Sequence, residues 1–158
     1  MVICAALACL AALPARAEGP PPGCYDRSYS AAHLASHPDQ IAARIRLWLE
    51  PDGDGTNAVG NLTIWTADQG HARRDGLGNS RFDSFLLCWT ENGRDFCGIE
   101  CDGGHASITV KGDTLDLSTD GMWVGETQGC GGAIDIAERP DTRVTYRMTR
   151  VPDAHCND

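Results

Sequence analysis

The stretch Cys88-Trp89-Thr90-Glu91-Asn92-Gly93-Arg94-Asp95-Phe96-Cys97 decides the fold of this chain. Its centre is Asn-Gly, the preferred pair for a two-residue type I′ turn, because both central residues of that turn need a positive φ. The pairs that flank this turn are Glu91 with Arg94, Thr90 with Asp95, Trp89 with Phe96, and Cys88 with Cys97. The last is a non-hydrogen-bonded pair, whose Cα atoms lie about 4.5 Å apart. Disulfide geometry allows that separation, so the sequence predicts a hairpin closed by a Cys88–Cys97 bridge, with Leu86 opposite Ile99 beyond it.

Two further hairpins are predicted downstream. A type II′ turn at Gly112-Asp113, with glycine at its first central position, aligns two apolar pairs on one face. These pairs are Val110 with Leu115 and Ile108 with Leu117. Apolar and polar residues alternate again on both sides of a loop at residues 139–141. This pattern predicts a third hairpin, with Ile136 opposite Val144 and Ile134 opposite Tyr146.

Upstream of the first hairpin, residues 41–49 and 62–66 alternate between apolar and polar side chains. The apolar residues of 41–49 also fit a helical stripe. We favour a strand, because the alternation is unbroken and the turn residues 51–53 follow at once. One helix is predicted at residues 29–37, with Ser28 or Ser30 as its N-cap and Pro38 at its end.

These segments amount to about eight antiparallel strands, joined mostly by tight turns and preceded by one short N-terminal helix. The predicted fold is therefore all-β: an antiparallel up-and-down barrel, lipocalin-like, because closure leaves no exposed strand edge. A β-sandwich is the alternative. Residues 18–158 have the length of a single domain.

Residues 1–17 predict a secretory signal peptide. An apolar run at residues 2–13 is followed by the small-residue pattern Ala15-Arg16-Ala17 before Glu18. The run is too short for a membrane span, which needs about 20 apolar residues, so we expect no stable membrane insertion. The expected location is the periplasm or the extracellular space.

Export places the six remaining cysteines in an oxidising compartment, where they are expected to form disulfides. The first hairpin accounts for one pair, and the sequence leaves the pairing of the other four open. By position along the chain we expect Cys24 with Cys156, which would join the two ends, and Cys101 with Cys130.

The charge of the chain excludes some partners. The net charge is −9, and removal of residues 1–17 takes away Arg16 alone among charged residues, which leaves −10. Nucleic acid is therefore not expected as a partner, whereas a basic protein is electrostatically favoured.

The first hairpin also has a second apolar face, formed by Phe85, Leu87, Trp89 and Phe96. An antiparallel hairpin normally buries one face and exposes the other. Either the N-terminal helix or a second core layer covers this face, or the face binds a ligand or partner. Trp65 and Trp123 are candidates to extend such a binding site.

Metal and catalytic motifs are weak in this sequence. His33 and His37 are four residues apart on the predicted helix, a spacing that could chelate a divalent ion, but no further ligand accompanies them. No serine stands in a nucleophile elbow, and no carboxylate pair is singled out. We therefore predict no metal, no cofactor and no catalytic residue.

Two stretches, Cys24-Tyr25-Asp26-Arg27-Ser28-Tyr29-Ser30 and Cys101-Asp102-Gly103-Gly104, resemble parts of a group of small, secreted, cysteine-containing bacterial proteins. This resemblance implies no activity. In size and strand count the chain is also similar to lipocalin-like barrels and to periplasmic lysozyme inhibitors, a likeness of architecture that does not define function. The predicted function is that of a non-enzymatic binding protein, with a small apolar molecule or a basic protein as ligand. A secreted hydrolase that uses carboxylates, or a structural envelope protein, is the alternative.

Overall fold

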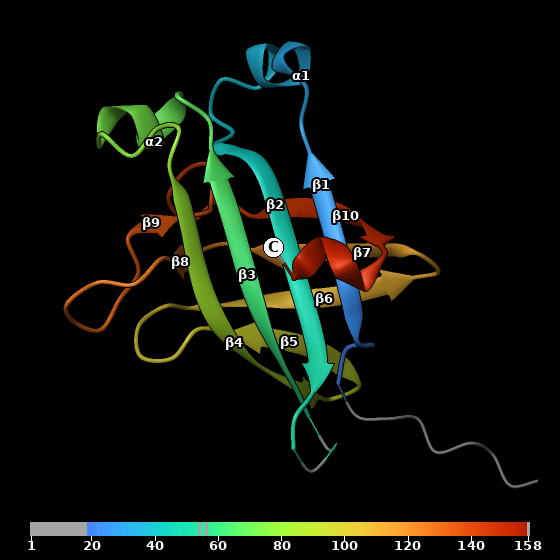
Figure 1. Cartoon of the computed structure of the whole chain (residues 1–158). Coiled ribbons are helices and arrows are strands. Elements are labelled where there is room, and N and C mark those ends of the chain that lie inside the picture. The colour runs from blue at the N-terminus through green and yellow to red at the C-terminus, as the bar shows by residue number, and fades with distance from the viewer. Residues whose placement is uncertain (1–18, 54, 56, 158) are drawn as a thin grey trace, which may run out of the picture.

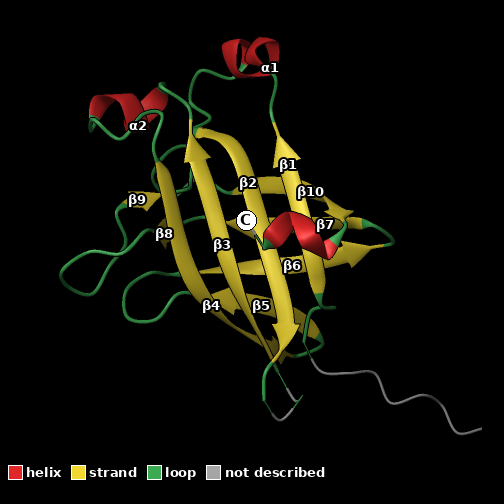
Figure 2. Ribbon diagram, in the orientation of Figure 1, coloured by secondary structure: helices red, strands yellow, loops and turns green. Residues whose placement is uncertain are grey.

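The computed structural model describes residues 19–53, 55 and 57–157. Its main feature is a closed barrel of eight antiparallel strands (Figure 1 and Figure 2). The strands are β1 (Gly23–Ser28), β2 (Ala42–Pro51), β3 (Ala58–Thr66), β4 (Arg81–Glu91), β5 (Arg94–Gly98), β6 (His105–Lys111), β7 (Thr114–Thr119) and β10 (Val144–Val151). Each strand from β1 to β6 pairs with the next one along the chain, and β10 closes the barrel between β7 and β1. The predicted up-and-down barrel is confirmed, and the alternative of a sandwich is not adopted.

Shorter elements surround the barrel. Helices α1 (Ala31–Ser36) and α2 (Gly70–Arg74) lie at one end of it (Figure 2). The 3-10 helix η1 (Asp153–Cys156) lies on the outer side of β1 and β2, and β8 (Trp123–Val124) pairs with β9 (Ile134–Asp135) in the segment between β7 and β10. Among the described residues, no helix has the length and apolar character needed to cross a membrane.

The interior of the barrel is filled by side chains. Alternate residues of each strand point inward, as the period of two in a strand requires. The largest fully buried strand residues are Tyr25, Ile45, Leu47, Leu49, Leu62, Ile64, Leu86, Leu115, Leu117 and Tyr146. The strand predictions for residues 41–49 and 62–66 are thus confirmed.

Both predicted tight turns form. Asn92 and Gly93 have φ values of 51° and 72°, as a type I′ turn requires, and Gly112 has a φ of 59°. The first hairpin has the predicted register, from Glu91 opposite Arg94 to Cys88 opposite Cys97, with 4.0 Å between the Cα atoms of the two cysteines. The second hairpin also has its predicted pairs.

The pairing of Leu86 with Ile99 does not form. The ladder ends at Leu87 and Gly98, because the backbone N–H of Ile99 donates instead to the carbonyl of Gly104 at 3.0 Å. The chain therefore turns away from β4 after β5.

The third predicted hairpin is wrong. Residues 134–135 pair with β8, and β10 pairs with β7 and β1. The backbone N–H of Ile136 donates to the carbonyl of Met122 at 2.9 Å, so this segment is held by residues that precede it. The strand that takes its place in the barrel is β1, which the sequence patterns did not indicate.

The short N-terminal helix is confirmed over most of its predicted range. Ser30, and not Ser28, is the N-cap of α1, and its hydroxyl accepts a hydrogen bond from the backbone N–H of His33 at 3.2 Å. Ser28 is the last residue of β1.

Three disulfides join Cys24 to Cys156, Cys88 to Cys97 and Cys101 to Cys130. These are the pairs expected from the hairpin register and from position along the chain. The first ties β1 to η1, the second spans the β4–β5 hairpin, and the third joins two loops outside the barrel. The predicted signal peptide lies outside the described residues.

Candidate functional site

The outer surface of β4 and β5 carries an apolar stripe of four side chains. Ser84, Leu86 and Cys88 of β4 are buried in the interior, so the residues between and after them point outward. We call the outward set the aromatic stripe; it consists of Phe85, Leu87, Trp89 and Phe96. Phe85 is 56% exposed and Leu87 42%, whereas Trp89 and Phe96 are half-buried. Helices α1 and α2 lie at the end of the barrel (Figure 2), so the predicted helical cover does not hide the stripe.

Trp89 is held in place by its neighbours. It lies opposite Phe96, with ring centroids 5.8 Å apart, and the ring of His105 packs edge-on against Phe96 at 6.0 Å. A Cβ at Gly98 would lie 3.1 Å from the Trp89 ring, so glycine at this position allows the indole to rest on β5. The Cys88–Cys97 bridge fixes the two strands from the inner side. The stripe is therefore a rigid surface.

Acidic side chains border the aromatic stripe on the side of Phe85 and Trp89, whereas Arg94 and Arg143 line a hollow beside Phe96. Two shallow hollows of about 260 Å³ lie along the stripe, one beside Phe85 and one beside Trp89. Glu100 lines both hollows, and Glu126 lines the one beside Phe85. The bridge between Cys101 and Cys130 ties together the two loops that carry these glutamates. An apolar stripe with an acidic border suits a partner whose surface combines apolar and basic groups.

Trp65 belongs to a different surface, on the outer face of β1 to β4. Its indole is surrounded by three guanidinium groups, whose Cζ atoms lie at 4.6, 5.4 and 5.4 Å from the ring centroid; they belong to Arg44, Arg46 and Arg81. Trp65 pairs with Arg81, four positions before Phe85, which places the two aromatic residues about 13 Å apart along the strands. Trp65 is therefore not part of the aromatic stripe.

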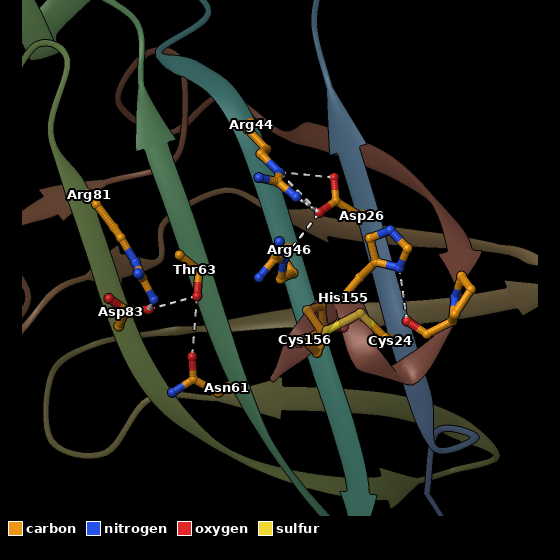
Figure 3. A network of polar contacts seen from close by, with 12 residues as sticks. Cys24, Asp26, Arg44, Arg46, Asn61, Thr63, Arg81, Asp83, His155 and Cys156 are labelled. Atoms are coloured by element: carbon orange, nitrogen blue, oxygen red, sulfur yellow. Dashed lines mark hydrogen bonds and ion pairs between the residues drawn. A yellow bond between two sulfur atoms is a disulfide. The ribbon is translucent and has the colours of Figure 1, made fainter. Parts of the chain in front are cut away.

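These arginines form a polar network with two aspartates (Figure 3). Asp26 accepts hydrogen bonds from Arg44 at 2.6 Å and from Arg46 at 3.1 Å. Asp83 accepts from Arg81 and from the hydroxyl of Thr63. Arg46 is 7% exposed although it lies on the outside of the barrel. This network was not predicted from the sequence. The one feature of the sequence that indicated it is the alternation of Arg44 and Arg46 with apolar residues in the predicted strand.

Trp123 also lies apart from the stripe. It is 45% exposed and lines a cleft of about 470 Å³ beside α2, together with His71, Asp135 and Arg139. Further along the cleft, the hydrogen bond from Arg74 holds the pKa of the Asp75 carboxyl below its usual range. The structure thus brings together Phe85, Leu87, Trp89 and Phe96 from the predicted candidates, and separates Trp65 and Trp123 from them.

His33 and His37 stack face to face, with ring centroids 4.2 Å apart. Each ring already has a hydrogen-bond partner: Gln40 for His33, and the carbonyl of His33 for His37. Across the part of the chain that the structure describes, no three histidine, cysteine, aspartate or glutamate side chains are grouped in a way that could hold a metal ion.

The chain matches no known protein family, and it shows no significant similarity to a characterised protein or to a solved structure. Its function is therefore inferred from the geometry described above.

Proposed function

We propose that this chain is a secreted or periplasmic binding protein without enzymatic activity, and that its aromatic stripe binds a basic protein. The disulfides support the location, since such bonds persist in oxidising compartments. The observation that carries the proposal is the exposure of Phe85 and Leu87, side by side on the outer face of a rigid barrel. Contiguous exposed apolar groups with a polar rim are typical of protein-binding surfaces.

Charge favours a basic partner over a neutral one. The chain carries a net charge of −9, and Glu100 and Glu126 place acidic groups next to the stripe. A basic protein is attracted by the long-range field, and its apolar groups can then dock on Phe85, Leu87 and Trp89. A small apolar ligand inside the barrel receives less support, because buried side chains such as Leu62, Leu86 and Leu117 fill the interior.

Calorimetric titration with two basic proteins, lysozyme and cytochrome c, tests this proposal. We expect saturable binding of at least one of them, weakened by added salt because exposed charges are screened. The double variant Phe85→Ser/Leu87→Ser should weaken binding by about tenfold or more, since removing apolar residues at the centre of an interface is costly. Both side chains are exposed, so the free energy of unfolding should change little.

Trp123→Ser is the matched control, because Trp123 is similarly exposed but lies away from the stripe. Its binding should equal that of the unmodified protein. Equal weakening by the control variant, or the absence of saturable heat with both basic proteins, would overturn the proposal. Saturable heat from a fatty acid alone would favour the small apolar ligand instead.

A further inference from the structure

A hollow of about 400 Å³ lies between α1 and the start of β10, and its charge is opposite to that of the whole chain. Three arginines line it, against one acidic residue, Glu138. They are Arg27 from β1, Arg143 just before β10, and Arg147 within β10. The chain as a whole has 22 acidic and 13 basic residues. We call this hollow the arginine pocket; its other principal walls are Tyr29, His33 and His37.

The arginines of this pocket have hydrogen-bonding capacity to spare. Arg27 has no carboxylate partner among the described residues; its guanidinium lies 5.1 Å from the centroid of the Tyr29 ring. Within the described part of the chain, Arg143 has one acidic partner, Asp120, at 3.5 Å. Arg147 donates two hydrogen bonds to Asp116, of the five N–H groups that a guanidinium offers. A ligand can therefore be bound without breaking these ion pairs.

Hydrogen bonds fix the orientation of both histidine rings. The Gln40 side chain donates its N–H to the carbonyl of Ala42 at 2.8 Å, so its oxygen faces His33 and accepts from the Nε2–H of that ring at 2.9 Å. His37 donates its Nδ1–H to the carbonyl of His33 at 2.9 Å. Nδ1 of His33 and Nε2 of His37 take no part in these two hydrogen bonds.

The wall formed by α1 is anchored to the rest of the molecule. The side-chain amide of Gln69 donates to the carbonyls of His37 and Gln40, both at 2.7 Å, just after the end of α1. At the other end, Ser30 caps the helix. The ring of Tyr29 stacks on that of His33, with centroids 4.8 Å apart. The aromatic wall is thus in place before any ligand binds.

We propose that the arginine pocket binds a small molecule through its oxyanion group, a phosphate or a carboxylate. Guanidinium groups pair with both kinds of oxyanion through directed, charge-assisted hydrogen bonds. The volume lies within the range of small-molecule sites. The stacked rings of Tyr29, His33 and His37 offer a flat surface to the uncharged part of the ligand. This site uses elements other than β4 and β5, so it does not depend on the function proposed for the aromatic stripe.

Titration with phenyl phosphate, inorganic phosphate and benzoate, followed by calorimetry at constant ionic strength, tests the site. We expect saturable binding of at least one aromatic anion. Inorganic phosphate lacks the ring, and should bind more weakly than phenyl phosphate.

Arg27→Gln and Arg143→Gln should each weaken binding by about tenfold. Arg73→Gln removes the same charge from an exposed side chain on α2 outside the pocket, and should have little effect. The site is disproved if neither aromatic anion binds saturably, or if Arg73→Gln weakens binding as much as the pocket variants do. Binding of phenyl phosphate but not benzoate would identify the oxyanion as a phosphate, and the reverse result as a carboxylate.

Discussion

At the scale of single residues, Asp135 accounts for the main departure from the predicted topology. Its Oδ1 accepts hydrogen bonds from the backbone N–H groups of Met122 and Ala137, both at 3.0 Å. Both of these residues are buried. A side chain that alternates between two isoleucines thus has a structural role, because it holds residues 134–137 against Met122 and away from β10.

Removing this acceptor should destabilise the protein. Asp135→Ala leaves two buried N–H groups without a partner, at a cost of about 1–3 kcal/mol each, so we expect the free energy of unfolding to fall by about 2–6 kcal/mol. Asp135→Asn keeps an oxygen in the same place and should lose clearly less. Urea denaturation of both variants makes the comparison. Equal losses in the two variants would contradict this role for the carboxylate oxygen.

At the scale of elements, the sequence predicted those strands whose partners are local. The hairpins of β4 with β5 and β6 with β7 each have their own turn signal, Asn92-Gly93 and Gly112-Asp113, and their registers follow from it. β1 has no such signal. Its pairing of Tyr25 with Arg150 on β10 joins residues far apart in the chain, and alternation within a segment does not identify a distant partner.

The two candidate sites differ in the same way, because one is built from residues close together in the chain and the other from residues far apart. The aromatic stripe could be predicted, because its four residues lie within one hairpin whose register the turn fixes. The arginine pocket could not. Its residues come from β1, from α1 and the residues that flank it, and from β10 and the residue before it, and they meet only when the barrel closes.

Two disulfides that constrain different elements should differ in their contribution to stability. Cys24–Cys156 spans 132 residues and ties β1 to the C-terminal η1, whereas Cys88–Cys97 spans 9 residues within one hairpin. The chain-entropy relation gives about 5 kcal/mol for the long loop and about 3 kcal/mol for the short one. We expect Cys24→Ser/Cys156→Ser to lower the free energy of unfolding more than Cys88→Ser/Cys97→Ser. Urea unfolding of both double variants measures the order, and the reverse order would refute the expectation.

At the scale of the whole molecule, the two proposed sites carry opposite charges. The acidic border of the aromatic stripe agrees in sign with the net charge of −9, and the arginine pocket at the end of the barrel opposes it. The long-range field therefore favours encounter with a basic protein, while an anion must be bound by short-range contacts with guanidinium groups. The two proposed sites should consequently respond to different ligands.

The whole molecule should also lose stability in alkali, because its three tyrosines, Tyr25, Tyr29 and Tyr146, all have a pKa raised above 10.0 by burial. Tyr146 is fully buried, and its hydroxyl donates to the carbonyl of Ile136 at 2.8 Å. Above pH 10 the unfolded chain releases tyrosine protons that the folded chain retains. The free energy of unfolding therefore falls as pH rises, and this stabilisation is fully present only below that pH.

Tyr146→Phe tests whether the free energy of unfolding falls with rising pH for this reason, because phenylalanine cannot ionise. The variant should be less stable by about 1–3 kcal/mol near neutral pH, since the buried carbonyl of Ile136 loses its donor. Above pH 10, however, its stability should fall less steeply than that of the unmodified protein, because one of the three protons retained on folding is gone. Urea midpoints measured from neutral pH to beyond the tyrosine range give both slopes. Parallel slopes would mean that burial of Tyr146 contributes nothing to the alkaline loss, and that burial of Tyr25 and Tyr29 accounts for it.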